Sequence, residues 1–138
     1  MTLAKEVEQQ LRGRHVPGLP REFVLPHYDG YSIANVAPTV ARILGVEWDG
    51  SAPPLPEDVW GAHAEGVRCI LLLVLDATGF LQLSHWMGGE RSIFTRAADA
   101  GVLLPITSVF PSTTVSALTT LWTGRTPVSY THLRAHET

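Results

Sequence analysis

Two residues of the 138-residue chain, Asp76 and Thr114, have side chains and positions that suit chemistry on a phosphate or a metal ion. Asp76 ends the apolar run of residues 69–75. A carboxylate at the end of a buried strand can bind a hard or borderline cation such as Zn²⁺ or Mg²⁺. It can equally cap the following helix through the amide of Thr78 or Gly79. The position of Asp76 alone does not decide between metal binding and helix capping.

Thr114 opens a predicted helix and follows two more hydroxyl residues, Ser112 and Thr113. A hydroxyl at that place lies near the positive end of the helix dipole and near free amides, which favour a phosphate or an alkoxide. A threonine hydroxyl becomes a good nucleophile only when its pKa is lowered, and a bound metal ion can do that. Capping is again the alternative, because all three residues are good N-caps.

The elements around these residues alternate between apolar runs and helical patterns. Residues 69–75 and 102–106 fit strands of a parallel sheet, and helices are expected after residue 79, over 93–100 and over 115–122. This order predicts an α/β fold, a partial three-layer α/β/α sandwich with parallel strands. The spacing from residue 76 to residue 114 suits one βα unit plus a second strand, so both side chains are expected at one sheet edge.

The first third of the chain predicts two helices and names no function. Residues 3–11 form a short amphipathic pattern, and residues 32–44 form another that Gly45 can end. We therefore interpret residues 1–66 as an N-terminal helical and loop segment that leads into a core starting at residue 67.

Residues 70–80 and 110–124 together carry a recognisable arrangement: a hydrophobic strand ending in Asp, then Phe-Pro-x-x-Thr opening a helix that ends in Thr-Gly. This resembles the type I phosphodiesterase and nucleotide pyrophosphatase family of the alkaline phosphatase superfamily, over roughly residues 67–127. The resemblance implies that Asp76 binds one of two divalent metal ions, usually zinc. It also implies that Thr114 is the catalytic nucleophile and contacts the metals.

The implied function is metal-dependent hydrolysis of a phosphodiester or phosphomonoester bond in a small molecule, by in-line attack of Thr114. The sequence has Thr113 where nucleotide pyrophosphatases often have Lys, so a nucleotide substrate is not implied. The Cys/Ser-x-Pro-x-Arg motif of sulfatases does not occur. The alternative is a non-catalytic α/β ligand-binding or interaction domain, in which Asp76 and Thr114 only cap helices.

The family's remaining Asp and His ligands normally lie well downstream of the nucleophile, and the sequence has few residues after Thr114. We therefore expect a truncated alkaline-phosphatase-like core over residues 67–127, with an incomplete site and no activity of its own. Residues 128–138 resemble a translated sequencing-library adapter, and we expect them to be a non-native tail. Under that interpretation the spacing of His132 and His136 carries no argument for zinc.

Composition excludes several other classes of function. The net charge is −3 and the pI is about 6.0, so the chain has no basic footprint for a nucleic acid duplex. A single cysteine excludes an internal disulfide. The N-terminus has no apolar signal region, and the longest apolar run is far shorter than the roughly 20 residues that span a bilayer. These features predict a cytoplasmic protein without a membrane segment, and they leave its oligomeric state open.

Overall fold

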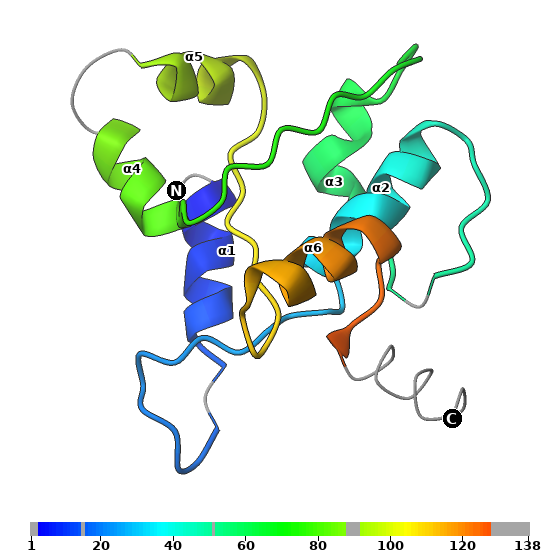
Figure 1. The fold of residues 1–138 in the computed structure, drawn as a ribbon. Helices are drawn as coiled ribbons and strands as arrows, with labels where there is room; N and C mark the ends of the chain where they lie inside the picture. The colour runs from blue at the N-terminus through cyan, green and yellow to red at the C-terminus, as the bar shows by residue number, and fades with distance from the viewer. Residues whose placement is uncertain (1–2, 15, 51, 88–91, 128–138) are drawn as a thin grey trace, which may run out of the picture.

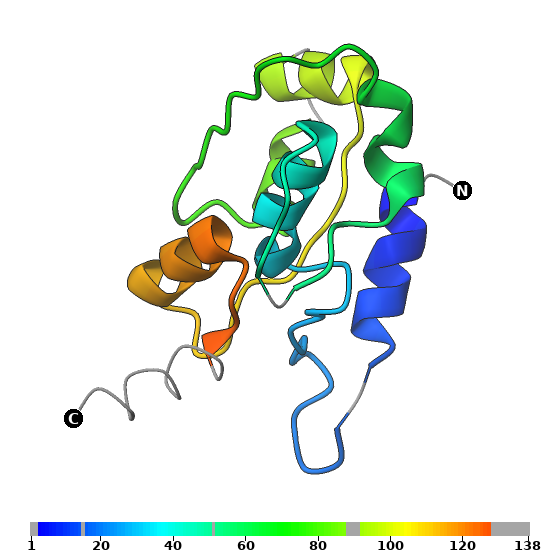
Figure 2. The same cartoon turned by 90° about the vertical axis from the view of Figure 1, so that its right-hand side faces the viewer.

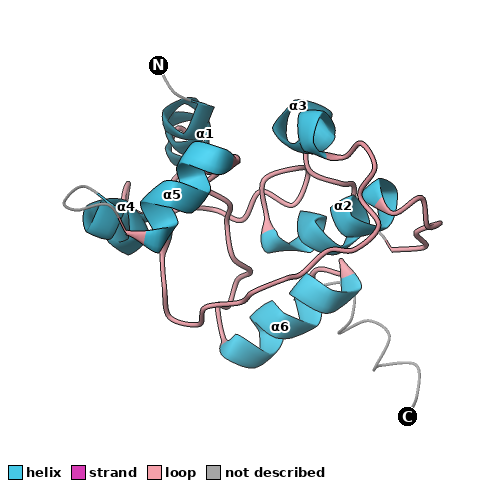
Figure 3. Ribbon diagram, turned by 90° about the horizontal axis from the view of Figure 1, so that it is seen from above, coloured by secondary structure: helices cyan, strands magenta, loops and turns pink. Residues whose placement is uncertain are grey.

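The computed structural model describes residues 3–14, 16–50, 52–87 and 92–127 as short helices joined by extended segments (Figure 1). In chain order the helices are α1 (Leu3–Arg12), the 3-10 helix η1 (Ile33–Asn35), α2 (Val36–Ile43), α3 (Glu57–Trp60), the 3-10 helix η2 (Gly61–His63), α4 (Phe80–Met87), α5 (Ile93–Ala100) and α6 (Thr114–Thr123). Helices α1, α4 and α5 lie on one side, and α2, α3 and α6 on the other (Figures 1 and 3). The segment from α5 to α6 runs from one side to the other (Figure 1), and Figure 2 shows the same segment from the side.

The α/β sandwich expected from the sequence is wrong. Within the ranges described, the elements are all helical and no sheet forms (Figure 3). The run 69–75 is extended, but no hydrogen bond joins its backbone to another described segment. Its side chains are largely open to solvent, with Leu71 92% and Leu73 76% exposed. Apolarity marks a candidate strand, but a stable strand also needs a neighbour that takes up its N–H and C=O groups.

The second expected strand, residues 102–106, fails for the same reason. The helix predictions are confirmed, because helices depend on local periodicity and caps. Ser32 N-caps η1, which continues into α2, and Gly45 follows the end of α2 with a left-handed φ of +68°. Helices α5 and α6 lie where the sequence placed them, whereas the short α3 was not predicted.

An isolated parallel bridge between Ser32 and Thr107 joins the N-terminal third to the segment before α6. The amide of Ile33 donates to the Thr107 carbonyl at 3.0 Å, and the Thr107 amide donates to the Tyr31 carbonyl at 2.8 Å. The Thr107 hydroxyl also donates to the Tyr31 carbonyl, at 3.0 Å, and accepts from the His27 amide at 2.8 Å. Ser32 and Thr107 are both buried. We call this set of contacts between the two segments the clamp.

Asn35 ties two loops together next to the clamp. Its side-chain oxygen accepts from the Ser32 amide at 2.8 Å, and its side-chain nitrogen donates to the carbonyls of Tyr28 at 2.7 Å and Pro53 at 2.8 Å. Asn35 and Ser32 are both fully buried, so the Ser32 amide would lose its partner without gaining water if the Asn35 side chain were removed.

Apolar burial is modest. The buried apolar residues are mostly small or β-branched: Val7, Leu11, Ala34, Ala41, Ala52, Val59, Val109 and Leu121. Many larger apolar side chains stay exposed, so the hydrophobic stabilisation of this fold is small and the buried polar contacts matter more. No described helix is long and apolar enough to cross a membrane. The expected non-native tail, residues 128–138, lies outside the described residues.

We expect Asn35→Ala to lower the free energy of unfolding by about 3 kcal/mol, since this buried side chain makes three hydrogen bonds, each contributing about 1 kcal/mol. Chemical denaturation followed by circular dichroism measures this change. Gln10→Ala, on the exposed face of α1, is the control and is expected to change stability little. Equal effects of the two substitutions would show that Asn35 does not organise the fold.

We expect the exposed run 69–75 to drive self-association, because an unpaired apolar extended segment templates pairing with other chains. The double substitution Leu71→Lys and Leu73→Lys is expected to reduce aggregation on heating while keeping the helical circular dichroism signal. Light scattering during a thermal ramp measures this. Val46→Lys, at a 60% exposed apolar position outside the run, is the matched control. Equal reduction by this control would exclude a special role for the run.

Candidate functional site

Thr113, and not Thr114, caps helix α6. The backbone of Thr113 is extended, with φ −104° and ψ 152°, and its hydroxyl oxygen accepts from the Ser116 amide at 3.2 Å. Thr114 is the first helical residue, one position later. The capping alternative for Thr114 is therefore wrong, and the Thr114 hydroxyl has a different partner.

That partner is the carboxylate of Asp76. The Thr114 hydroxyl donates to Oδ2 of Asp76 at 3.3 Å, and Oδ1 of Asp76 accepts from the Ala77 amide at 2.9 Å. The amide of Gly79, just before α4, donates to the Gln82 side chain at 2.9 Å. Asp76 therefore does not cap α4 through Gly79. The sequence prediction that Asp76 and Thr114 converge is confirmed, although no sheet edge brings them together.

A backbone reversal at Ala77 sets the direction of the Asp76 side chain. Ala77 has φ +56°, in the left-handed region that costs a residue with a Cβ roughly 1–2 kcal/mol. The reversal turns the chain from the extended run into the loop that starts α4, and the Ala77 amide folds back onto the Asp76 carboxylate. Local strain of this kind is common at functional sites.

The hydrogen bond between the Thr114 hydroxyl and the Asp76 carboxylate is long and therefore weak. Hydroxyl–carboxylate hydrogen bonds are typically about 2.5–2.7 Å long, whereas this one measures 3.3 Å. Both residues are exposed, so water competes for the same groups. We infer that this hydrogen bond adds little to the stability of the fold. It matters because it holds the Thr114 hydroxyl beside a carboxylate at the surface.

The rest of α6 holds Thr114 in place. The helix packs against η1 and α2, and it buries Thr120 and Leu121 on that side. Gly124 ends it with a left-handed φ of +59°, and its amide donates to the Thr120 carbonyl at 2.8 Å. A Cβ on Gly124 would lie 2.7 Å from a ring carbon of Trp48, so this close approach requires glycine.

Asp76 and Thr114 line one open pocket, which we call the site pocket. It encloses about 770 Å³ between residues 74–80, the segment 103–108 and the first turns of α6. Its size suits a small organic ester. The sequence offered Ser112 only as a possible helix cap and did not point to Ser108, and the hydroxyl oxygens of these two residues lie 3.1 Å apart on the pocket wall. Scattered serines carry no signal of this kind before the chain is folded.

The described residues do not fit a complete metal centre. Across those ranges, no group of three or more His, Cys, Asp or Glu side chains gathers where it could hold an ion. Asp76 and Thr114 offer a carboxylate and a hydroxyl, whereas a zinc ion takes about four ligands. This pair alone therefore cannot hold two ions.

Asp76 and Thr114 lie in a stretch of the chain that matches a known protein family. Residues 70–130 match the type I phosphodiesterase / nucleotide pyrophosphatase family. The match is partial and covers less than half of the chain, but it includes both Asp76 and Thr114. It confirms the resemblance that the motifs indicated and suggests a relationship to phosphoesterases. No curated protein and no solved structure matches the chain.

We expect Thr113→Ala to lower the free energy of unfolding by about 1 kcal/mol, the usual effect of removing a threonine N-cap. Thr114→Ala is the matched control, and we expect it to change stability by less than about 0.5 kcal/mol because its exposed contact is weak. Urea denaturation of the two variants measures the difference. The reverse order would mean that Thr114 is the cap.

Proposed function

We propose that this chain carries the nucleophile of a phosphoester hydrolase, Thr114, together with one carboxylate ligand of its metal centre, Asp76. The carrying observation is the 3.3 Å hydrogen bond between them at the start of α6. The partial family match, which spans both residues, supports the same assignment. We also propose that residues 67–127 begin the catalytic core and that residues 1–66 lead into it.

The start of α6 suits a phosphoryl group. The amides of Thr114 and Val115 have no acceptor among the described residues, because the Thr113 cap takes the Ser116 amide and the Thr113 carbonyl takes the Ala117 amide. Free amides at a helix start bind anionic oxygens, and the helix dipole adds to their attraction. A phosphoester bound there has its phosphorus close to the Thr114 hydroxyl.

The proposed reaction is a displacement at phosphorus. The Thr114 oxygen forms a bond to phosphorus while the bond to the ester oxygen breaks, and the proton that the Thr114 hydroxyl loses ends on the departing alcohol. Water then hydrolyses the phosphothreonine and frees phosphate. During the first of these two reaction steps, Asp76 accepts the hydrogen bond of the Thr114 hydroxyl and so orients the attacking oxygen.

The described residues leave this hydroxyl weakly activated. A threonine hydroxyl is a poor nucleophile without a strong base or a complete metal centre, and the described donors do not build one. Further ligands for two zinc ions have to come from residues outside those described. We therefore expect no turnover and no burst of nitrophenol from p-nitrophenyl phosphate with zinc. A burst would show that the two residues suffice.

The exposed apolar run 69–75 favours a second candidate function, that of a non-catalytic interaction domain. In that case neither Asp76 nor Thr114 has a reason to respond to a metal ion. Zinc binding therefore separates the two functions.

Zinc titration followed by amide NMR shifts tests the proposal. We expect Zn²⁺ to shift the amides of Ala77 and Thr114 in the wild type, and Asp76→Asn to weaken this binding at least about 10-fold, by loss of a ligand. Asp99→Asn removes an exposed carboxylate on α5 and is the matched control. Equal responses in both variants would exclude Asp76 as a ligand. Absence of any zinc response at these amides would favour the interaction domain.

A further inference from the structure

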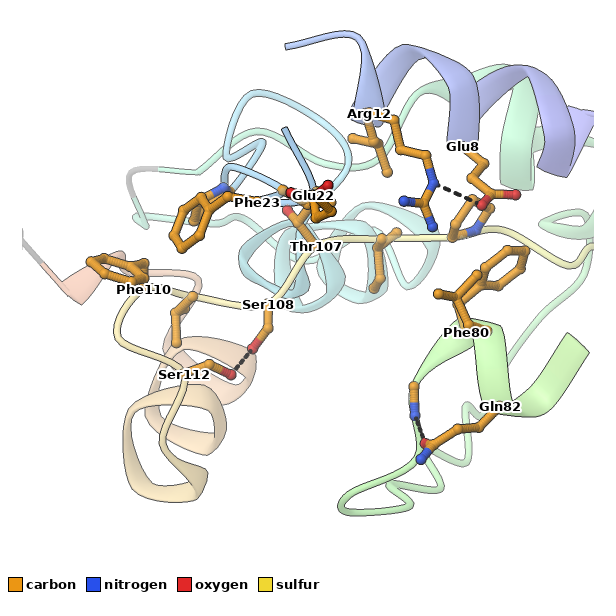
Figure 4. A pocket seen from close by; sticks show the side chains of 18 of the residues that line it. Glu8, Arg12, Glu22, Phe23, Phe80, Gln82, Thr107, Ser108, Phe110 and Ser112 are labelled. Atoms are coloured by element: carbon orange, nitrogen blue, oxygen red, sulfur yellow. Dashed lines mark hydrogen bonds and ion pairs between the residues drawn. The ribbon is translucent and has the colours of Figure 1, made fainter. Parts of the chain in front are cut away.

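A second hollow, which we call the aromatic pocket, lies beside the site pocket (Figure 4). It encloses about 780 Å³ between α1, the loop 22–26, the start of α4 and the segment 105–112. Its lining is mostly apolar, as ligand pockets for organic groups are. Neither the family match nor the sequence motifs assign it a role.

Three phenylalanines give this pocket its chemical character. Phe23 and Phe110 meet edge to face, with ring centroids 5.5 Å apart and planes at 75°. Phe80 lies across the hollow from them (Figure 4). Phe110 is 61% exposed, so its ring surface is available to a ligand. Such an arrangement favours a flat aromatic group, which gains from edge and face contacts beyond the area it buries.

The charged residues of the pocket disfavour an anionic occupant. The Arg12 guanidinium is paired with the Glu8 carboxylate at 2.9 Å, so its charge is already compensated. Glu22 adds a further carboxylate to the lining. A polyphosphate or another anionic group would therefore meet repulsion without a free cation to bind. An uncharged aromatic group meets no such penalty.

The aromatic pocket and the site pocket share a wall. Residues of both linings include Gly79, Phe80, Ile106, Ser108 and Ser112. The hydroxyl pair of Ser108 and Ser112 stands at this border and can donate to an ester oxygen that passes between the pockets. Ser112 also lies two residues before Thr114, so the border between the pockets is close to Thr114 along the chain.

We propose that the aromatic pocket receives the leaving group of an aryl phosphoester whose phosphoryl group binds at Thr114. This rests on the proposed function and narrows its substrate class to esters of uncharged aromatic alcohols. Phe23, Phe80 and Phe110 contact the ring, and the two serines contact the bridging oxygen. The phosphoryl group lies against the amides at the start of α6.

Binding of three probes tests this inference: 1-naphthyl phosphate, inorganic phosphate and 1-naphthol, each titrated into the chain and followed by amide NMR shifts. We expect 1-naphthyl phosphate to bind about 10-fold tighter than phosphate, because the pocket adds aromatic contacts. Phe110→Ala is expected to remove this advantage and leave phosphate binding unchanged. Phe80→Leu, a milder substitution, is expected to reduce the advantage in part.

Phe94→Ala is the matched control, since Phe94 lies on α5 and lines neither pocket. Circular dichroism checks that each variant keeps its helices. If phosphate shifts the Thr114 amide but 1-naphthyl phosphate binds no tighter, or ignores Phe110→Ala, the aromatic subsite is wrong and the proposed function stands. If 1-naphthol binds at Phe110 while phosphate leaves Thr114 unshifted, the proposed function fails and the substrate assignment fails with it.

Discussion

The clamp between Ser32 and Thr107 is the constraint on which the position of the site depends. It is the one place where described backbone segments far apart in sequence pair directly, and Ser32 and Thr107 are buried there. Buried N–H and C=O groups need partners, so the chain cannot slide at this point without losing several hydrogen bonds together. Thr107 lies seven residues before Thr114, and α6 rests on η1 and α2. Fixing Thr107 therefore fixes where α6 begins and what its first residue faces.

The sequence predicted the helices well and the strands badly, for a physical reason. A helix such as α5 is specified by residues close in sequence, from the Ser92 cap to Gly101. A strand is specified by a partner far away in sequence, and nothing in the apolar run 69–75 names that partner. The run stays extended in the structure, but its backbone is unpaired and its side chains are exposed.

The site shows the same division between local and distant information. Asp76 and Thr114 were predicted to converge through a sheet edge, and they converge through a left-handed turn at Ala77 and the docking of α6. Three hydroxyls in a row left the helix cap undecided, and only the folded backbone shows that Thr113 takes it. This choice matters for function, because it leaves the Thr114 hydroxyl free to point at a carboxylate. The aromatic pocket depends on contacts between distant segments such as that of Phe23 with Phe110, and the serine pair depends on the turn before α6, which explains why no motif revealed them.

Asp76 and Thr114 face each other at the start of α6. Nuclear Overhauser effects between the β-protons of Asp76 and the methyl group of Thr114, measured on the isotopically labelled chain, test this arrangement most directly. We expect clear cross-peaks between these protons, together with cross-peaks from Thr107 to Tyr31 that report the clamp. Cross-peaks from Thr114 to its own helix alone, with none to Asp76, would contradict the account even if the helices themselves were correct.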